Sequence, residues 1–405
     1  MSASDQETPR RTAGALPPLW TGNYLKVWTA NFMMYFSFML LMPLLPLYLS
    51  DTFQVDKHVI GLVLSGYTIT ALLIRPFSGF LVDSFPRKTV LLACYFLFFA
   101  LFAGYLAAGT LLLFTVVRTL HGAPFGAATV SNSTVAIDVS DPARRAEGIG
   151  YYGLSNNLAM ALAPTTAIWL YGITQNYRTL FLTALICAAV GFAIDCTLRL
   201  PQRQLLRPAR KIALDRFFLL AGWREGITLG CFSFAYGILS TYLAIYGKEE
   251  LGITGGTGLF FMILAIGLMT SRIVGGRTLR KGLVARNAAA GVLISLCGYL
   301  LFAAVHSPVG YYGAALIIGL GNGHMYPAFQ TMFINLAPNS QRGTANSTLL
   351  TSWDIGLGIG VLLGGSLAEF LGYHSAFWMA WAVHLAGVAL FFACTRRHFM
   401  QHRLR

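Results

Sequence analysis

Continuous apolar stretches, separated by short polar turns, make up most of the chain. Each stretch is apolar on every side and about 20 residues long, the length that a helix needs to cross the hydrocarbon core of a bilayer. The stretches lack the alternation of apolar and polar positions that strands of a membrane barrel show over about ten residues. We therefore predict an all-α membrane protein with about twelve transmembrane helices, at residues 27–50, 58–82, 88–109, 111–138, 148–171, 178–199, 217–246, 257–277, 285–306, 310–337, 343–370 and 374–394.

Lys and Arg are concentrated in the turns on one side of these helices. If the N-terminus lies on that side, the opposite side holds only Lys57, Arg178 and Lys248. Because cytoplasmic loops are enriched in Lys and Arg, the asymmetry predicts that both termini are cytoplasmic and that the number of spans is even. We expect a multi-pass protein of the plasma or inner membrane. The basic residues that remain inside spans are Arg75, Arg118, Arg224 and Arg272.

Composition supports this interpretation and excludes other classes of protein. Of the 405 residues, 56% are hydrophobic and 11% are charged, whereas an ordinary soluble domain has about 25% charged residues. These values exclude a soluble enzyme, a disordered chain and a small disulfide-built domain. The net charge of +14 follows from the basic turns and does not indicate a nucleic-acid partner. The six cysteines form no CxxC pair and have no His at ligand spacing, so we expect neither a metal nor a cofactor.

The two halves of the chain repeat each other. The same number of positions separates Arg75 from Arg272, Gly122 from Gly319, and Arg145 from Arg342. Two six-helix halves are typical of a transporter in which one bundle rocks against the other, with the substrate near the midplane. We therefore expect a cytoplasmic tail (1–26), an N-terminal bundle (27–199), a basic linker (200–216), a C-terminal bundle (217–394) and a second cytoplasmic tail (395–405). The linker either lies against anionic lipid headgroups or serves as a solvated connection that enforces topology.

The turn after the second span carries the sequence Gly79-Phe-Leu-Val-Asp83-Ser-Phe-Pro-Arg87-Lys88. It resembles the cytoplasmic loop motif of the major facilitator superfamily, Gly-x-Leu-x-Asp-Arg-x-Gly-Arg-Arg/Lys, with Ser84 and Pro86 departing from it. Gly79 allows close helix approach, and Asp83 can accept hydrogen bonds from Arg87 or from a facing helix N-terminus. The resemblance implies a gating latch, formed by Gly79, Asp83, Arg87 and Lys88, that breaks as the halves rock. The alternative is an ordinary basic loop that fixes orientation.

The fourth span carries Arg118-Thr-Leu-His121-Gly122-Ala-Pro124-Phe-Gly126. This looks like the Arg-x-x-Gln-Gly-x-Gly motif of the family, with His121 in place of Gln. The resemblance assigns Arg118 to proton coupling, and His121 lies one turn away and is able to titrate. The alternative is that Arg118 snorkels to the outer interface.

The fifth span contains Ala159-Met-Ala-Leu-Ala163-Pro164-Thr-Thr-Ala167, which is similar to the Gly-x-x-x-Gly-Pro-x-x-Gly-Gly motif of proton-driven exporters in the superfamily, with Ala in place of Gly. The small residues and the helix-bending Pro164 are kept. The resemblance implies the drug and sugar efflux branches, whose members exchange protons for substrate.

Spans one, four, seven and ten usually line the cavity of this fold, as the resemblance implies. Polar and aromatic residues recur on one helical face in several of these spans, and amides in lipid need a partner. The alternative for the aromatic residues is simple packing. We expect substrate contacts from Asn31, Tyr35, Phe38, Asn156, Asn157, Phe232, Tyr236, Asn322, Tyr326 and Gln330.

Asp354 is a carboxylate near the middle of a span, about 18 Å along the helix from Arg342. Such a group is a candidate for a proton relay, together with Arg118, His121 and His324. The alternative is a structural ion pair with Arg272. Arg75 and Arg272 are expected to be structural intramembrane charges, with Arg75 tied to Asn156 or Asn157. Near span ends we expect contact with water, at Asp138, Asp195 and Glu369.

Together these features predict a secondary transporter and not an enzyme. We expect proton-coupled export of a small amphipathic drug-like or sugar-like compound by a monomer embedded in the lipid bilayer. One alternative is a proton-coupled importer on the same fold. A second alternative is a membrane-embedded enzyme or sensor, which would need a polar cluster such as Ser-His-Asp within one leaflet, and the sequence suggests none.

Overall fold

The computed structural model describes residues 17–55, 57–200, 216–253 and 256–404. Within these ranges the regular secondary structure is helical throughout, as the sequence predicts. Residues 1–16 of the expected N-terminal tail and residues 201–215 of the expected linker lie outside the described residues. The N-terminal half contains α1 (Gly22–Leu41), α2 (Leu45–Phe53), α3 (Lys57–Ser84), α4 (Arg87–Ala107), α5 (Leu111–Val139), α6 (Arg145–Thr174) and α7 (Tyr177–Cys196).

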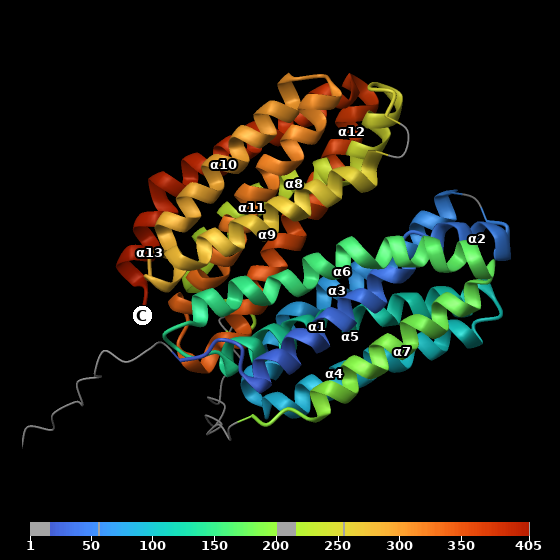
Figure 1. Ribbon diagram of the computed structural model, residues 1–405, viewed down its shortest axis with the longest axis horizontal. Helices are drawn as coiled ribbons and strands as arrows, with labels where there is room; N and C mark the ends of the chain where they lie inside the picture. The colour runs from blue at the N-terminus through green and yellow to red at the C-terminus, as the bar shows by residue number, and fades with distance from the viewer. Residues whose placement is uncertain (1–16, 56, 201–215, 254–255, 405) are drawn as a thin grey trace, which may run out of the picture.

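The C-terminal half repeats this arrangement. It contains α8 (Trp223–Glu249), α9 (Gly256–Arg280), α10 (Val284–Ala304), α11 (Pro308–Leu336), α12 (Arg342–Leu390) and α13 (Arg396–His402). Each half forms its own bundle around apolar cores, and one core of the C-terminal bundle extends to Ile137 and Ile149 of the N-terminal bundle. Figure 1 shows the bundles meeting at the side where the chain ends and diverging toward the opposite side. We call these the terminal side and the far side. The all-helical, two-bundle fold class is thereby confirmed.

Eight of the described helices are long and apolar enough to cross a membrane, or nine if the bent pair α1 and α2 forms one span. The expected number of about twelve differs for identifiable reasons. Helix α12 holds two spans, because Gly372 breaks it with a φ of 82° that an L side chain rarely adopts. Helices α6 and α11 are long enough, but they carry the polar residues of the bundle interior, which lowers their hydropathy.

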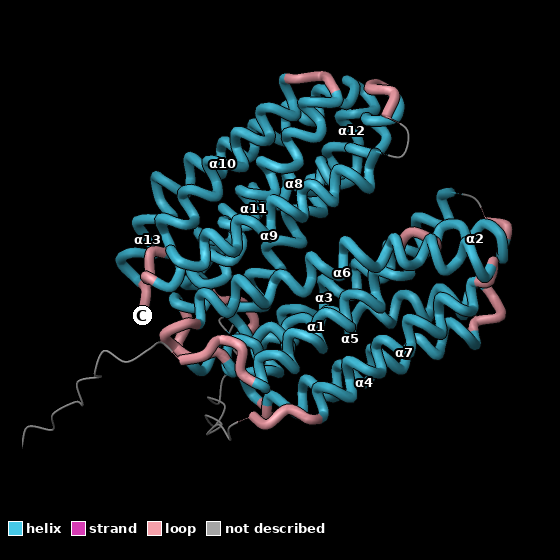
Figure 2. The backbone as a smooth tube through the Cα atoms, viewed as in Figure 1, coloured by secondary structure: helices cyan, strands magenta, loops and turns pink. Residues whose placement is uncertain are grey.

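The first expected span, 27–50, is not one straight helix. Helix α1 ends at Leu41, and α2 begins at Leu45 with a bend of 41° between them. Pro46 lies in the first turn of α2, where its missing N–H costs nothing. In Figure 2 this break has the colour of a loop, as do the short connections between the other helices.

The expected C-terminal tail, 395–405, is largely helical. It begins within a turn of π-helix at Phe391–Thr395 and continues as α13. Nδ1 of His398 lies 2.9 Å from Oε1 of the fully buried Glu225 on α8. The hydroxyls of Thr228 and Thr395 are 2.7 Å apart. These contacts hold α13 and the π-helical turn against the start of α8.

The bundles contact each other mainly through two helix pairs, α3 with α12 and α6 with α9. Glycine allows the close approach of the first pair. A Cβ atom at Gly79 would lie 2.7 Å from Cβ of Ser347 and 2.9 Å from the carbonyl oxygen of Gly343. The contact between α3 and α12 therefore depends on the absence of a side chain at this position.

Candidate functional site

An ion pair joins the two bundles inside the membrane-spanning region. Nη1 of Arg75, on α3, lies 2.8 Å from Oδ2 of Asp354, on α12. The same Nη1 donates to the carbonyl of Leu350 at 3.1 Å, and Ser347 donates to the carbonyl of Arg75 at 2.8 Å. The Asp354 side chain is 22% exposed and that of Arg75 is 8% exposed. Asp354 thus pairs with Arg75, not with Arg272, and Arg75 is not tied to Asn156 or Asn157.

Aromatic side chains of the N-terminal bundle line one side of this pair. The ring of Tyr35 lies edge-on to Phe125 with 5.6 Å between centroids. Phe38 stacks on Phe125 at 4.6 Å and on Tyr67 at 4.9 Å. Tyr35 lies within electrostatic range of both Arg75 and Asp354. The expected positions Tyr35 and Phe38 therefore belong to one aromatic cluster, and Tyr35 lies at its border with the ion pair.

A second aromatic cluster lies on the other side and comes from the C-terminal bundle. Trp353 packs against Tyr326 at 5.2 Å and against Tyr236 at 5.8 Å. Tyr326 lies within electrostatic range of Tyr35, of the ion pair and of Arg272. Tyr236 and Tyr326 were predicted from the sequence, whereas Trp353 was not, although its position next to Asp354 is a signal that could have pointed to it.

Arg272, the repeat partner of Arg75, crosses between the bundles in the same way. Its Nη1 donates to the carbonyl of Gly150 on α6 at 2.5 Å, and the residue is 7% exposed. A Cβ atom at Gly153 would overlap the guanidinium group. Each half of the chain thus inserts one arginine against a helix of the other half.

Arg118 lies within the N-terminal bundle and is 2% exposed. Its guanidinium carbon is 4.2 Å from the centroid of the Tyr67 ring, and Nη1 is 3.4 Å from the hydroxyl of Tyr105. That hydroxyl also lies 2.9 Å from Nδ1 of His121. Arg118 therefore does not snorkel to the interface; it is held by a cation–π contact and by a buried Tyr–His pair.

Asn31 is fully buried and satisfied within the N-terminal bundle. Its Nδ2 donates to Ser155 at 2.7 Å and also to Asn156, while Tyr152 donates to its Oδ1 at 2.7 Å. Asn132, which was not predicted from the sequence, donates to the same oxygen at 3.4 Å. This network ties α1 and α5 to α6.

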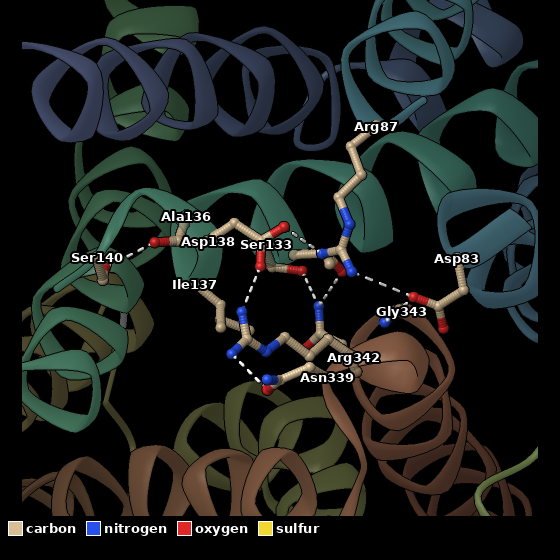
Figure 3. Close-up of polar contacts among 12 residues, drawn as sticks. Asp83, Arg87, Ser133, Ala136, Ile137, Asp138, Ser140, Asn339, Arg342 and Gly343 are labelled. Atoms are coloured by element: carbon tan, nitrogen blue, oxygen red, sulfur yellow. Dashed lines mark hydrogen bonds and ion pairs between the residues drawn. The ribbon is translucent and has the colours of Figure 1, made fainter. Parts of the chain in front are cut away.

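A polar network closes the terminal side between the bundles (Figure 3). Asp83, at the end of α3, accepts hydrogen bonds from the backbone N–H groups of Gly343 at 2.9 Å and Thr344 at 2.8 Å, and from the Thr344 hydroxyl at 3.0 Å. These donors are the first turn of α12, where the helix dipole favours a negative charge. Arg87 lies 3.3 Å from Asp83.

The network continues to the end of α5. Arg87 lies 2.5 Å from Asp138, and Arg342, at the start of α12, lies 2.7 Å from the same carboxylate. Asp138 was expected to face water, but it bridges one arginine of each bundle. Its role could not be seen in the sequence because its partners are distant along the chain. The repeated Arg145 and Arg342 were the available signal.

The second half of the repeat supplies a counterpart, in which an arginine stands at the position equivalent to Asp83 and a glutamate at the position equivalent to Thr344. Arg280, at the end of α9, lies 3.6 Å from Glu147 in the first turn of α6. Asp83 and Arg280 are repeat partners, as are Glu147 and Thr344. The neighbouring Arg144 donates to Glu147 at 2.8 Å, and this hydrogen bond raises the pKa of Arg144.

Asn346 on α12 also links the bundles. It accepts a hydrogen bond from Gln330 at 3.0 Å and donates to Ser133 on α5. Gln330 therefore lies in the terminal-side contact and not beside the aromatic clusters. Asn346 was missed because nothing in its own span marks it as an interface residue.

Four other expected site residues lie elsewhere. Lys88 was expected in the latch but donates to the carbonyls of Cys196 at 2.9 Å and Leu198 at 2.8 Å, within its own bundle. The remaining three belong to the interior of the C-terminal bundle: Phe232 packs on His384 at 4.7 Å, His324 lies 3.0 Å from Oδ1 of Asn287, and Asn322 is 7% exposed. Asp195, expected to be wet, is fully buried.

Comparisons with known proteins agree with this architecture. The model of the Major Facilitator Superfamily matches residues 27–357 and 288–402. An uncharacterized MFS-type transporter of Pseudomonas aeruginosa is 26% identical over 392 residues, covering 91% of this chain and 92% of the relative. The staphylopine export protein of Staphylococcus aureus is 22% identical over 343 residues, covering 79% of this chain and 82% of the relative.

Solved structures share the fold. The human organic anion transporter MFSD10 superposes with a TM-score of 0.80 at 17% identity, covering 91% of this chain and 98% of that one. The Escherichia coli fucose:proton symporter FucP, in its outward conformation, gives 0.77 at 15% identity, covering 93% and 99%. These relatives are transporters and not enzymes. The chain belongs to the Major Facilitator Superfamily, as a multi-pass membrane transporter of small molecules.

Proposed function

We propose that the protein exports a small amphipathic compound in exchange for protons, with Asp354 as the proton-carrying group. The observation that carries the proposal is the Arg75–Asp354 ion pair, which joins the bundles inside the membrane. An ionisable group at this depth is costly and is typical of proton pathways. Protonation of Asp354 removes its charge and breaks the pair, while Arg75 keeps its own charge.

The state that the pair stabilises supports the proposed direction of transport. With the terminal side taken as cytoplasmic, from the distribution of Lys and Arg, the structure is closed toward the cytoplasm. The ionised pair holds this arrangement. A proton arriving from outside neutralises Asp354, and the bundles are then free to rock and release the proton inside. The aromatic clusters around Tyr35 and Trp353 suit an amphipathic compound. The relationship to the staphylopine export protein also favours export.

Everted membrane vesicles provide the test. Vesicles containing the protein are energised with an interior-acid proton gradient, and accumulation of ethidium, 2-naphthoate and a labelled hexose is measured. We expect gradient-dependent accumulation of at least one probe by the wild type and its loss in Asp354→Asn, which should still exchange the probe without a gradient. Glu369→Gln is the matched control, because this exposed carboxylate lies on the same helix.

Two results would contradict the proposal. Accumulation by Asp354→Asn at the wild-type level would remove the proton-carrying role. Uptake into right-side-out vesicles, driven by protons moving in the same direction as the probe, would favour the importer on the same fold.

A further inference from the structure

Two buried polar groups on α6 and α9 have hydrogen-bond donors without an acceptor. Nε of Arg272 and Nδ2 of Asn157 are buried and have no partner among the described residues. The hydrogen bond that Arg272 makes goes to the Gly150 carbonyl, and no carboxylate of the described part of the chain lies within ion-pair distance of it. A buried cation without a counter-charge is costly in a membrane protein. What is missing at this position is an acceptor, preferably a charged one.

The two groups face the same surface of α6. Gly150, Gly153 and Asn157 follow one another at i, i+3 and i+7, which places them on one helical face. The guanidinium group of Arg272 lies against Gly153, where a Cβ atom would overlap it. Asn157 is one turn further along this face. The unpaired donors therefore border one region between α6 of the N-terminal bundle and α9 of the C-terminal bundle.

The internal repeat shows what this region lacks. Arg272 corresponds to Arg75, and Asn157 corresponds to Asp354. In the first case the aspartate neutralises the arginine at 2.8 Å. In the second case the equivalent position holds a neutral amide, so the positive charge of Arg272 stays uncompensated.

Neighbouring groups do not supply the missing charge. Glu147, one turn before Gly150, is engaged by Arg144 at 2.8 Å and by Arg280 at 3.6 Å. The groups in electrostatic range of Arg272 are the phenols of Tyr24 and Tyr326. Tyr326 in turn packs against Trp353. An apolar aromatic wall thus lies beside an unpaired cation.

We infer that Arg272 and Asn157 bind an anionic group of the transported compound, a carboxylate or a similar oxyanion. The inference rests on the proposed transport function and specifies its substrate class as amphipathic anions, whose apolar part packs on Tyr326 and Trp353. Arginine suits this role because its guanidinium offers two parallel donors to an oxyanion. An anion bound here contacts one helix of each bundle, so its arrival and departure act on the position of one bundle against the other.

The test compares three probes with the same ring system and different charge. The purified full-length protein is titrated with 2-naphthoate, 2-naphthamide and 2-naphthylmethylamine, and binding is followed by tryptophan fluorescence and by thermal stabilisation. For the wild type we expect naphthoate to bind about tenfold or more tightly than the amide, the size of one charge-assisted contact. The amine should bind more weakly than both.

Variants identify the groups that cause this preference. Arg272→Gln should abolish the preference for naphthoate, and Arg272→Lys should retain part of it. Asn157→Asp should abolish it as well, because the new carboxylate pairs with Arg272 as Asp354 pairs with Arg75. This variant keeps the test decisive if Arg272→Gln does not fold. Arg286→Gln is the control, since it removes an exposed positive charge of the same bundle and should bind as the wild type does.

The outcomes separate this inference from the proposed function. The inference is overturned if wild-type protein does not prefer naphthoate over the amide, or if Asn157→Asp keeps the preference. Asp354→Asn should bind naphthoate with the preference intact while losing gradient-driven transport. If instead Asp354→Asn transports normally and Arg272→Gln loses the preference, the proton assignment fails and the anion site stands.

Discussion

At the scale of single residues, the equivalent arginines of the two repeats, Arg75 and Arg272, contact different groups. Arg75 meets a carboxylate, and Arg272 meets the backbone of α6. An arginine with a titratable partner responds to pH, whereas an arginine without one keeps its charge and attracts an anion. The same residue type, inserted at equivalent positions, thus serves coupling in one half and recognition in the other under our proposals.

The ion pair between Arg75 and Asp354 should show strong energetic coupling. Removing one partner leaves the other charge buried and alone, whereas removing both relieves this penalty. We expect Arg75→Gln and Asp354→Asn each to destabilise the protein, and the double variant to recover a coupling energy of about 1 to 3 kcal/mol. Thermal unfolding of the four proteins in one detergent measures the cycle. Additive effects would show that the pair contributes little.

A histidine cluster on the far side should make stability depend on pH. His306 lies between α10 and α11. Desolvation is the larger cause that lowers the pKa of His306, and the nearby charge of His374 is the smaller one. His374 itself lies 2.8 Å from Glu250, and Nδ1 of His306 is 3.2 Å from the Tyr246 hydroxyl. A lowered His pKa means that the folded state binds the proton less readily than the unfolded state. Stability should therefore fall as pH decreases from about 6.5, the unfolded value.

Melting temperatures at pH 7.5 and 5.5 check this expectation. The wild type should lose stability at the lower pH, and His306→Gln should lose less. An equal loss in both proteins would assign the effect to other groups.

Some site residues could be predicted from the sequence and others could not, depending on how far along the chain their partners lie. Asp83 and Arg87 could be predicted because a local motif contains both. Asp138 could not, since its partners Arg87 and Arg342 are far from it in sequence and are brought together only by the packed bundles. Lys88 was assigned to the latch by its neighbours in the motif, but its long side chain reaches back to its own bundle.

At the scale of helices, hydropathy predicted where the chain crosses the membrane and one of the two helix breaks. The boundary expected between spans 343–370 and 374–394 coincides with Gly372, whose backbone conformation interrupts α12. The separation of α1 and α2 over three residues was missed, because it leaves the hydrophobic pattern of the expected span 27–50 unchanged. The motif predicted a close helix approach at Gly79, but not that α12 is the partner, because a glycine in the sequence does not show which helix it faces.

The close packing of α3 against α12 should depend on Gly79. A side chain here meets the backbone carbonyl of Gly343, which cannot rotate away. We expect Gly79→Leu to destabilise the closed terminal side by about 1 to 3 kcal/mol through overpacking. Labelling of a cysteine introduced on the terminal side should become faster. Gly172→Leu is the control, because no atom lies within 4 Å of the added Cβ; similar labelling in both variants would contradict the expectation.

At the scale of the whole molecule, the internal repeat predicted more than the helices alone did. Its two halves predicted the two bundles, and its paired positions lie at the two bundle contacts, at Arg75 and Arg272 and again at Asp83 and Arg280. The repeat could not predict which state the molecule adopts, because both states of a rocking transporter use the same internal contacts within each bundle. The state follows from the contacts between bundles, which depend on a few polar residues.

The terminal-side contact should therefore be sensitive to one carboxylate. Asp83 accepts three hydrogen bonds from the first turn of α12, and its charge is favoured there by the helix dipole. Asp83→Asn removes that charge and one acceptor while leaving the interior of each bundle intact. We expect the population with an open terminal side to rise about tenfold, which corresponds to a loss of about 1.4 kcal/mol.

Spin labels at Phe85 and Leu283, exposed positions in different bundles, measure this change as a longer distance between them. Asp141→Asn is the matched control: this carboxylate lies on the same side, but it accepts a hydrogen bond from Ala143 within its own loop. A distance distribution that stays unchanged in Asp83→Asn would mean that Asp138 and its two arginines hold the bundles together without the cap on α12. If the distance lengthens in Asp83→Asn but not in Asp141→Asn, the hydrogen bonds between Asp83 and the first turn of α12 are the contact that limits opening. The arginines that pair with Asp138 are present in both variants and therefore do not explain the difference.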